Sequence, residues 1–444
     1  MAKTDISTPA GTGRLDSLTP DQKEFLKQMW AEIFLITDSG EAAFSTLSVG
    51  LLTPASSTNN SVNGFDGTSI QSKSSTGKKS WFSSSKPSSS TQHQHHASSD
   101  DTPSNRLGFA EIGIPADKVR DALWSDILGD HPDTLALRFL RARKWNVRNS
   151  MNMMLKAFKW RLDENIEELK EKNEDELELK YRGFKKQMEM GKSYAHGTDK
   201  QGRVVVYINV RLHKPADQDQ KVMEKYTVYM MEMSRMMIKY PIETACIVFD
   251  LSGFGLSNMD YNFVKYMVQC FEAYYPESLG VLLVHKAPLV FWGIWKVIEP
   301  WLDPVVASKI RFTRSDKDLT EYIDAAHLLA RFEGGKDKFT YEYIPVMPGE
   351  NDHMRDEEAK ERLTEEWKAI MWKFEALTRE WVVCKKTKGA RPEEVIEAER
   401  NQLTKEMHAA YIKLDYYIRA KTLYQRGEHP VYLPDGDTVW PYKN

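Results

Sequence analysis

The sequence predicts an α/β domain built from βαβ units around a mainly parallel sheet, preceded by a small all-helical domain and followed by a helical hairpin. Three observations point to this fold class. Between about residues 190 and 345, short apolar, β-branched runs alternate with helical stretches, which is typical of parallel sheets. Before them, apolar residues recur at helical spacing. After them, two long segments repeat apolar residues at alternating steps of four and three.

Residues 1–36 are expected to hold one helix. Thr19 can cap it, Pro20 suits its first position, and Gln22 can complete a capping box. Residues 37–105 are rich in serine and poor in aliphatic side chains. Such a segment buries too little apolar surface to offset the entropy of ordering it, so a disordered linker is predicted. Its histidines lack a fixed scaffold, and no metal site is expected there.

Residues 106–185 are predicted to form the small helical domain. A helical pattern covers residues 116–128, another begins at Pro132, and a third carries an apolar stripe from Met151 to Leu162. Residues 186–345 are predicted to form the α/β domain. Its expected strands are at 203–210, 245–251, 281–285 and 309–312, with helices at about 219–240, 259–275 and 289–307.

Residues 350–444 are predicted to form the C-terminal helical hairpin and a tail. Two apolar-periodic runs are separated by a Lys-Gly-Ala-Arg-Pro segment, and its Pro392 can begin the second helix. We expect an antiparallel pair of helices that packs on itself or on the domain before it.

Composition excludes several classes of protein. The net charge of −3 gives no overall attraction to nucleic acid, so no nucleic-acid partner is expected. The three cysteines form no CxxC pair, which fits a reducing cytosol, and neither a secretory signal nor an apolar run of membrane-spanning length is found. We therefore expect a cytoplasmic protein, and a monomer.

No catalytic motif is present, and no enzyme is predicted. Residues 191–193 (GKS) resemble the end of a phosphate-binding loop, but Lys186 stands where that loop needs a glycine. Residues 253–258 (GFGLSN) follow a strand but lack the third glycine of a dinucleotide site. His285 ends an apolar strand, where a structural histidine is more common than a catalyst. No cofactor, metal ligand or catalytic residue is assigned.

Methionine and aromatic side chains are concentrated in the α/β part. Six methionines lie between residues 223 and 237, and residues 288–304 (PLVFWGIWKVIEPWLDP) are apolar almost all round. Methionine suits both an ordinary core and a cavity that holds a flexible hydrocarbon. A helix that is apolar on every side is either buried or in contact with lipid. Core packing is expected for most of these methionines, and for residues 288–304 composition favours neither alternative.

Four motifs, in order and with matching spacing over roughly residues 115–340, resemble the CRAL-TRIO lipid-binding family. They are residues 138–145 (RFLRARKW), 198–203 (TDKQGR), 274–280 (YYPESLG) and 301–310 (WLDPVVASKI). Within the family, the chain is most similar to fungal phosphatidylinositol transfer proteins of the yeast secretory type, and among these to divergent members that lack the phosphatidylcholine site.

This resemblance implies a lipid site with a charged mouth. The inositol phosphate headgroup would be held by Arg143, Lys144, Glu277 and Lys309. Basic side chains suit a phosphodiester, and a carboxylate suits a polyhydroxy ring. Without the resemblance, surface ion pairs would be the simpler interpretation of these charges. The resemblance also makes the segment at about 289–307 a mobile gate that covers the acyl chains and touches the membrane through Trp292, Trp295 and Trp301.

The chain departs from the family pattern at four positions. Val306 replaces a threonine of the headgroup site, and Ala245, Ile247 and Ala195 replace hydroxyl-bearing residues associated with phosphatidylcholine. Each buried polar group left unsatisfied costs about 1–3 kcal/mol. We therefore expect little phosphatidylcholine exchange, and a wall apolar enough for a sterol or an isoprenoid such as squalene.

The expected function is phosphatidylinositol binding and transfer, with lipid as ligand and only transient membrane contact. Peripheral association with internal membranes, microsomal or endosomal, or with lipid droplets follows from it. The alternative is a lipid sensor or scaffold that recruits a lipid-metabolising enzyme, a lipid kinase or phospholipase, through the C-terminal hairpin.

Overall fold

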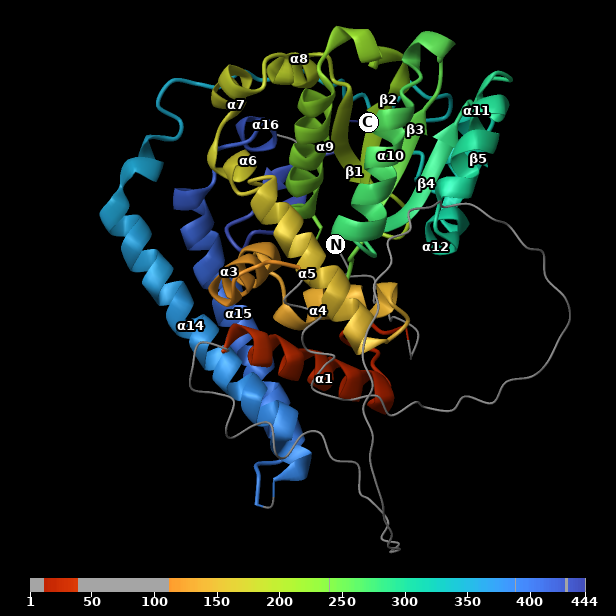
Figure 1. Ribbon diagram of the computed structural model, residues 1–444. Helices are drawn as coiled ribbons and strands as arrows, with labels where there is room; N and C mark the ends of the chain where they lie inside the picture. Colours follow the sequence, from red (N-terminus) through yellow and green to blue (C-terminus); the bar gives the residue numbers. More distant parts are fainter. Residues whose placement is uncertain (1–11, 39–111, 239, 388, 428–429, 444) are drawn as a thin grey trace, which may run out of the picture.

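The computed structural model describes residues 12–38, 112–238, 240–387, 389–427 and 430–443. Beyond its first two residues, the predicted serine-rich linker lies outside these ranges. Figure 1 shows the sheet and its helices on one side of the molecule and the helical unit with the long hairpin on the other. The predicted fold class, a mainly parallel α/β domain flanked by helical parts, is confirmed.

The sheet contains five strands in the order β1-β2-β3-β4-β5. Strand β1 is antiparallel to β2, and β2 to β5 are mutually parallel. The strands are β1 Ser193–Thr198, β2 Val204–Asn209, β3 Ala245–Asp250, β4 Leu279–His285 and β5 Ile310–Thr313. Strand β1 was not predicted, because its sequence SYAHGT lacks a β-branched apolar run and is a strand only through its pairing with β2.

The crossover segments all cover one face of the sheet. Strands β2 to β5 follow one another both in the sequence and in the sheet. Because parallel strands are joined by right-handed crossovers, every connection then lies on the same side of the sheet. The segments are α9 Gln220–Arg235, α10 Tyr261–Gln269 with the π-helical turn η6 Cys270–Tyr274, and α11 Phe291–Ile298, η7 Glu299–Trp301 and α12 Pro304–Ser308.

The expectation of one helix over 289–307 is wrong. Helix α11 ends at Ile298, a 3-10 turn follows, and α12 begins at Pro304. Pro300 lacks the N–H that would continue α11. The Asp303 side chain then accepts a hydrogen bond from the Val305 N–H at 2.7 Å and caps α12.

Side chains alternate between the two faces of the sheet, as the two-residue period of a strand requires. Val205 and Val248 are buried on the face covered by the chain after β5, which contains α13 Asp316–Leu319. Val206 and Ile247 lie on the other face, toward α9 and α10. Both faces are therefore covered, which explains why the strands are continuous apolar runs.

The helical unit and the C-terminal hairpin share one hydrophobic core. The unit consists of α1 Pro20–Thr37, α3 Ala116–Ile127, α4 Pro132–Ala142 and α5 Val147–Asp163, followed by the short helices α6 Glu168–Glu171, α7 Glu174–Lys180 and α8 Phe184–Glu189. The hairpin consists of α14 Glu357–Val383 and α15 Glu393–Ile418. The capping box predicted at Thr19 is present.

The hairpin packs on α1 and the helical unit in addition to packing on itself (Figure 1). A buried carboxylate connects three of these helices. Asp133 accepts hydrogen bonds from Trp30 Nε1 and Arg400 Nη2, each at 2.7 Å. Burial opposes the charge of Asp133, but Arg400 and the hydrogen bonds hold its pKa below the usual range. A common core is thus formed by residues from three ranges that were predicted separately, 1–36, 106–185 and 350–444.

The C-terminal tail covers the edge strand of the sheet. After α16 Leu423–Arg426 and the small hairpin β6 Val431–Tyr432 and β7 Thr438–Val439, the chain runs beside β1. The Tyr424 hydroxyl accepts a hydrogen bond from the Ala195 N–H at 2.8 Å, and the Tyr442 hydroxyl accepts one from the Thr198 N–H at 3.1 Å. An uncovered strand edge is a site for unwanted pairing, so this contact protects the fold.

A buried ionic cluster joins the helical unit to the α/β domain. Glu232 on α9 is fully buried and pairs with Arg161 on α5 at 2.8 Å and Arg235 at 3.2 Å. Asp126 on α3 pairs with the same arginines at 3.1 and 2.7 Å, and the Tyr275 hydroxyl donates to Glu232 at 2.7 Å. Burial alone would raise the pKa of Glu232, but the two arginines hold it well below the usual range.

The remaining short 3-10 turns are η3 Val210–Leu212, η4 Pro215–Asp217, η5 Leu256–Asn258, η8 Asp352–Arg355 and η9 Cys384–Lys386. Among the residues with described positions, no helix combines the length and the apolar character that crossing a membrane would require.

Candidate functional site

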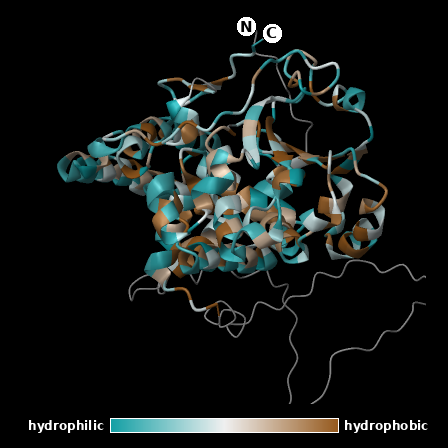
Figure 2. Cartoon of the chain, turned by 90° about the horizontal axis from the view of Figure 1, so that it is seen from above, coloured by the Kyte–Doolittle hydropathy of each residue, from teal (hydrophilic) through white to brown (hydrophobic). Residues whose placement is uncertain are grey.

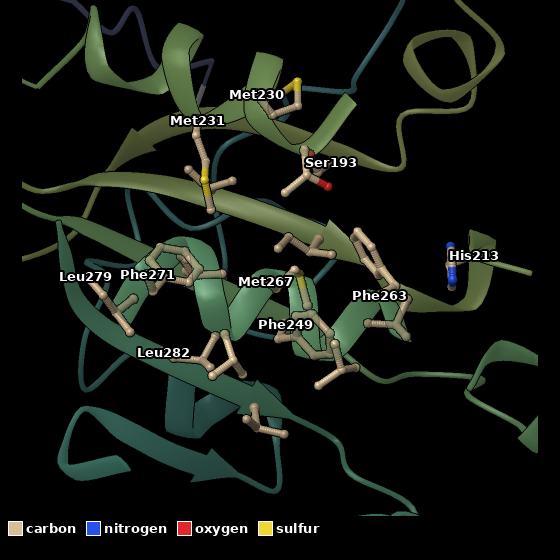
Figure 3. A pocket seen from close by; sticks show the side chains of 18 of the residues that line it. Ser193, His213, Met230, Met231, Phe249, Phe263, Met267, Phe271, Leu279 and Leu282 are labelled. Atoms are coloured by element: carbon tan, nitrogen blue, oxygen red, sulfur yellow. The ribbon is translucent and has the colours of Figure 1, made fainter. Parts of the chain in front are cut away.

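A large apolar cavity lies between the sheet and its crossover helices. Its volume is about 230 Å³. A single water needs about 10–15 Å³ of such space, so the cavity has room for roughly fifteen or more groups of that size. Figure 3 shows Phe249 and Leu282 from the strands facing Met230 and Met231 of α9 and side chains of α10. The α/β domain is therefore hollow on one face of its sheet.

The methionine-rich segment is divided between core and cavity. Met223, Met230 and Met231 line the cavity, whereas Met233 and Met237 are buried in the neighbouring core. This helix thus contributes to both the core and the cavity wall, and Met223 and Met230 belong to both. Unbranched, polarisable side chains at the cavity wall can adapt to the shape of a flexible hydrocarbon.

The segment from Leu289 to Val306 closes one side of the cavity. Phe291, Trp295, Ile298, Leu302 and Val306 line it from within. The outer side of the same segment is also apolar: Leu289 is 90% exposed, Trp292 38% and Val297 46%. Figure 2 shows this part of the ribbon, at the right where α11 and α12 lie in Figure 1, in brown and white. A segment apolar on both sides can face hydrocarbon within and a lipid surface outside.

The three tryptophans predicted for the gate have different surroundings. Trp295 lies at the cavity wall, and Trp292 packs its ring against Phe312 at 4.8 Å while remaining partly exposed. Trp301 lies on η7 under the ammonium group of Lys265, 4.8 Å from its ring centre, and beside the ring of Tyr261.

Two of the four predicted headgroup residues lie together at the amino ends of the strands. Lys309 Nζ is 3.4 Å from Glu277 Oε2, and about a fifth of each side chain is exposed. Their sequence neighbours Ser278 and Ile310 line the cavity. Glu277 precedes β4 and Lys309 precedes β5, so the parallel pairing of these strands brings the two charges together at one end of the cavity.

Arg143 and Lys144 come from the end of α4. The Arg143 side chain donates to the Ala142 carbonyl at 3.0 Å, and its charge acts on Glu272 in η6. Lys144 is exposed, with a φ of 51°. Within the described ranges, neither basic side chain forms a hydrogen bond or ion pair with Glu277 or Lys309. The link between α4 and Glu277 is Arg138, whose Nη1 lies 3.5 Å from the Glu277 carbonyl oxygen.

The positions associated with phosphatidylcholine are apolar, and two of them face the cavity. Ala245 and Ile247 line its wall, as does Val306. Ala195 is not part of the cavity wall; it lies opposite Val206 on the same face of the sheet, buried in the neighbouring hydrophobic core. Only Ala245 and Ile247 of the three thus affect the polarity of the cavity wall directly.

Sequence reasoning missed a polar group at the other end of the cavity. Lys192, His213 and Asp260 line it beside the carboxyl ends of the strands. His213 Nε2 lies 3.3 Å from Asp260 Oδ2, and burial lowers the pKa of the histidine. The sequence signal for this group is Lys192 itself, within residues 191–193 (GKS). These residues match only the end of a phosphate-binding loop, because Lys186 stands where the loop needs a glycine.

Comparison with known families identifies the chain. Residues 188–334 match the model of the CRAL/TRIO domain, and residues 82–156 match that of the CRAL/TRIO N-terminal domain. The two matched ranges, 147 and 75 residues long, make up half of the 444-residue chain. The chain belongs to the CRAL/TRIO family. The cavity described above lies within the matched CRAL/TRIO domain.

Among known proteins, this CRAL/TRIO chain is similar to several from fungi. It is 42% identical to a CRAL-TRIO domain-containing protein of Schizosaccharomyces pombe over 309 residues, which are 69% of this chain and 68% of the relative. It is 35% identical to phosphatidylinositol transfer protein CSR1 of Eremothecium gossypii over 436 residues, which cover 94% and 98% of the two chains. It is 31% identical to the Sec14 cytosolic factor of Schizosaccharomyces pombe over 222 residues, 46% of this chain and 74% of the relative.

His285 has a structural environment in the CRAL/TRIO domain. It is fully buried, with Nδ1 3.0 Å from Thr313 Oγ1 and Nε2 2.8 Å from Asp316 Oδ1. Burial lowers its pKa. Its hydrogen bonds join the end of β4 to β5 and α13 and do not face the cavity. Among the side chains that the structure describes, no cluster of three or more histidine, cysteine or carboxylate groups could hold a metal ion.

Proposed function

We propose that this protein binds phosphatidylinositol and transfers it between membranes. The observation that carries the proposal is the apolar cavity with a lysine–glutamate pair at one end and a segment apolar on both sides over its flank. The similarity to a phosphatidylinositol transfer protein along nearly the whole chain supports the same lipid. No catalytic step is part of the proposal.

The energetic problem of lipid transfer is the exposure of the acyl chains. Drawing about thirty methylenes into water costs on the order of 20 kcal/mol, at ~0.8 kcal/mol each. A cavity with a hydrocarbon-like wall exchanges one apolar environment for another, so most of this cost disappears. The cavity supports this role because most of its wall is formed by aliphatic, aromatic and methionine side chains.

The charged end of the cavity would hold the headgroup. In the proposal, Lys309 binds the phosphodiester and Glu277 accepts hydrogen bonds from inositol hydroxyls, while Arg143 and Lys144 add positive charge from α4. The apolar residues Ala245 and Ile247 offer a choline phosphate no hydrogen-bond partner, so phosphatidylcholine exchange would be weak.

The function is tested by vesicle-to-vesicle transfer with the full chain. We expect the protein to accelerate phosphatidylinositol movement at least about tenfold over the spontaneous rate, and phosphatidylcholine movement far less. Mass spectrometry of lipid that co-purifies with the protein is the companion measurement. A protein that loads phosphatidylinositol without moving it is a sensor or scaffold for a lipid-metabolising enzyme. A co-purified sterol or isoprenoid would replace phosphatidylinositol as the ligand.

The outer side of the gate would enter the membrane surface. The proposed place of action is the cytoplasm, with peripheral association to internal membranes or lipid droplets, in line with a relative named a cytosolic factor. Movement of α11 and α12 would open the cavity on the membrane, and the breaks at Glu299–Trp301 give the segment places to bend.

Leu289→Glu is therefore expected to weaken binding to phosphatidylinositol-containing vesicles about tenfold or more, because a leucine that enters a lipid surface contributes about 1.5–3 kcal/mol. Leu179→Glu is the matched control: Leu179 is 89% exposed against 90% for Leu289, but lies on α7 of the helical unit. Vesicle co-sedimentation measures both. Equal binding by the two variants would contradict the assignment of the membrane-facing side.

A further inference from the structure

The polar group around Lys192 lies at the end of the cavity opposite the proposed headgroup site. Lys192 precedes β1, and its carbonyl accepts the N–H of Asn209, the last residue of β2, at 2.8 Å. It is thus beside the carboxyl ends of the parallel strands, whereas Glu277 and Lys309 precede β4 and β5. Figure 3 shows Leu279 and His213 at opposite ends of the cavity.

The separation of the two ends follows from strand length. Strands of six or seven residues, at about 3.3 Å per residue, span roughly 20 Å. One headgroup cannot reach both ends. Polar atoms near Lys192 therefore face whatever lies deep in the cavity, and a hydrocarbon chain alone gives them no partner.

The ammonium group of Lys192 has few hydrogen-bond acceptors. Its side chain is buried, with 3% of the residue exposed. Nζ donates to Gln218 Oε1 at 3.2 Å and has only long contacts to His213 Nδ1 at 3.5 Å and Met223 Sδ at 3.6 Å. A carboxylate only accepts, so the His213 Nε2 beside Asp260 carries the proton. Nδ1 of the neutral ring then faces Lys192 as an acceptor.

The charge of Lys192 is also uncompensated at close range. Within the described part of the chain, no carboxylate oxygen lies within 4.0 Å of its Nζ; Asp260 is reached only through the imidazole of His213. Asp217 and Lys186 act on Lys192 from farther away, with opposite sign, and burial lowers the pKa of the ammonium group to about 8. An unpaired buried charge is costly, and an anionic ligand would remove that cost.

We propose that Lys192, with Gln218 and His213 beside it, forms a second polar subsite that takes the carboxylate of a long-chain fatty acid whose hydrocarbon lies in the apolar cavity. A single ammonium group matches a single negative charge, and the nearby Asp260 disfavours a more highly charged phosphate. The subsite uses none of the residues proposed for the phosphatidylinositol headgroup, although its ligand would occupy the same cavity.

The test compares oleate with oleyl alcohol, which has the same chain and no charge. Delipidated full-length protein is titrated with each in a fluorescent-probe displacement assay. We expect oleate to bind at least about tenfold more tightly, and Lys192→Met to lose this preference. Lys186→Met is the matched control, because Lys186 is exposed and outside the cavity, and it should keep the preference. Equal affinities in the wild type, or an unchanged preference in Lys192→Met, would overturn the proposal.

A second measurement does not depend on the stability of the variant. Oleate labelled at its carboxyl carbon reports its own protonation by NMR when bound to the wild-type protein. A carboxylate beside an ammonium group stays ionised to lower pH, so the pKa of oleate bound to the wild-type protein should lie at or below the value of about 4.3 of an unperturbed carboxyl. A bound oleate whose carboxyl titrates as in an apolar environment, with a raised pKa, would refute the subsite. Neither experiment uses phosphatidylinositol, so failure here leaves the proposed transfer function standing.

Discussion

Lys309→Glu is expected to reduce phosphatidylinositol transfer by about a hundredfold or more, because losing one partner of a charge pair that becomes buried when the lipid binds costs about 2–5 kcal/mol in binding. The substitution removes the proposed phosphate ligand and places a second carboxylate next to Glu277, whose Oε2 lies 3.4 Å from the present ammonium group. Lys309→Ala should show a smaller loss in the same direction, since it removes the cation without adding repulsion. Vesicle-to-vesicle transfer of labelled phosphatidylinositol measures both.

The structure predicts that these variants fold. The Lys309–Glu277 pair is about a fifth exposed on each side, and such pairs contribute only about 0–1 kcal/mol to stability. Lys317→Glu makes the same charge change on α13, in the chain that covers the opposite face of the sheet, and should leave transfer unchanged. Full transfer by Lys309→Glu would remove the headgroup assignment. A loss shared by Lys317→Glu would show a general effect of charge.

Glu232→Gln is expected to lower the free energy of unfolding by about 3–5 kcal/mol, because it removes one of the carboxylates that compensate the buried arginines and leaves an excess of buried positive charge. Glu232 is fully buried between Arg161 and Arg235 and also accepts the Tyr275 hydroxyl. Asp126 and Glu167 would remain, two carboxylates for the three cations Arg161, Arg235 and Lys170. Urea unfolding followed by circular dichroism measures the change.

The contribution of Glu232 should depend on pH with a definite sign. Its pKa is held well below the usual value in the folded chain, so its stabilisation is present above the unfolded pKa of about 4.3 and is lost as the pH falls. The difference between wild type and Glu232→Gln should therefore shrink in acid. Asp163→Asn, in an exposed pair with Lys159, is the control and should change stability by less than about 1 kcal/mol. A comparable loss in the two variants would contradict the role of the buried cluster.

Elements with a strong local signal were predictable from the sequence. The helix at Thr19-Pro20 has its capping box, and strands β2 to β5 lie where the apolar, β-branched runs predict them. Strand β1 was missed because its residues 193–198 are held by pairing with β2 and by the distant tail. The gate was predicted as one helix because its apolar pattern continues across Pro300, although the backbone cannot.

The site was predictable only in part. Glu277 and Lys309 were identified through family motifs, and the structure places them side by side, but it shows no direct contact of Arg143 with either. In the sequence, Lys192 stands only in an incomplete phosphate-loop motif, which does not indicate a cavity-lining role. Its position at the cavity end depends on the pairing of β1 with β2 and on the side chains of Gln218 and His213.

The order of strands β2 to β5 and of the helices between them along the chain follows from patterns within short stretches of sequence, whereas their order in the sheet, which places the crossover segments on one side, comes from the structure. Whether the space between those layers is filled is a different matter. It depends on how side chains from α9, α10, α11 and five strands meet, and no window of sequence contains that information. The family resemblance implies a lipid site with Lys309 at its mouth, but only the tertiary structure shows that the layers enclose a cavity and that a second lysine, Lys192, lies at its opposite end, because packing volume and the pairing of charges are sums over residues far apart in the chain.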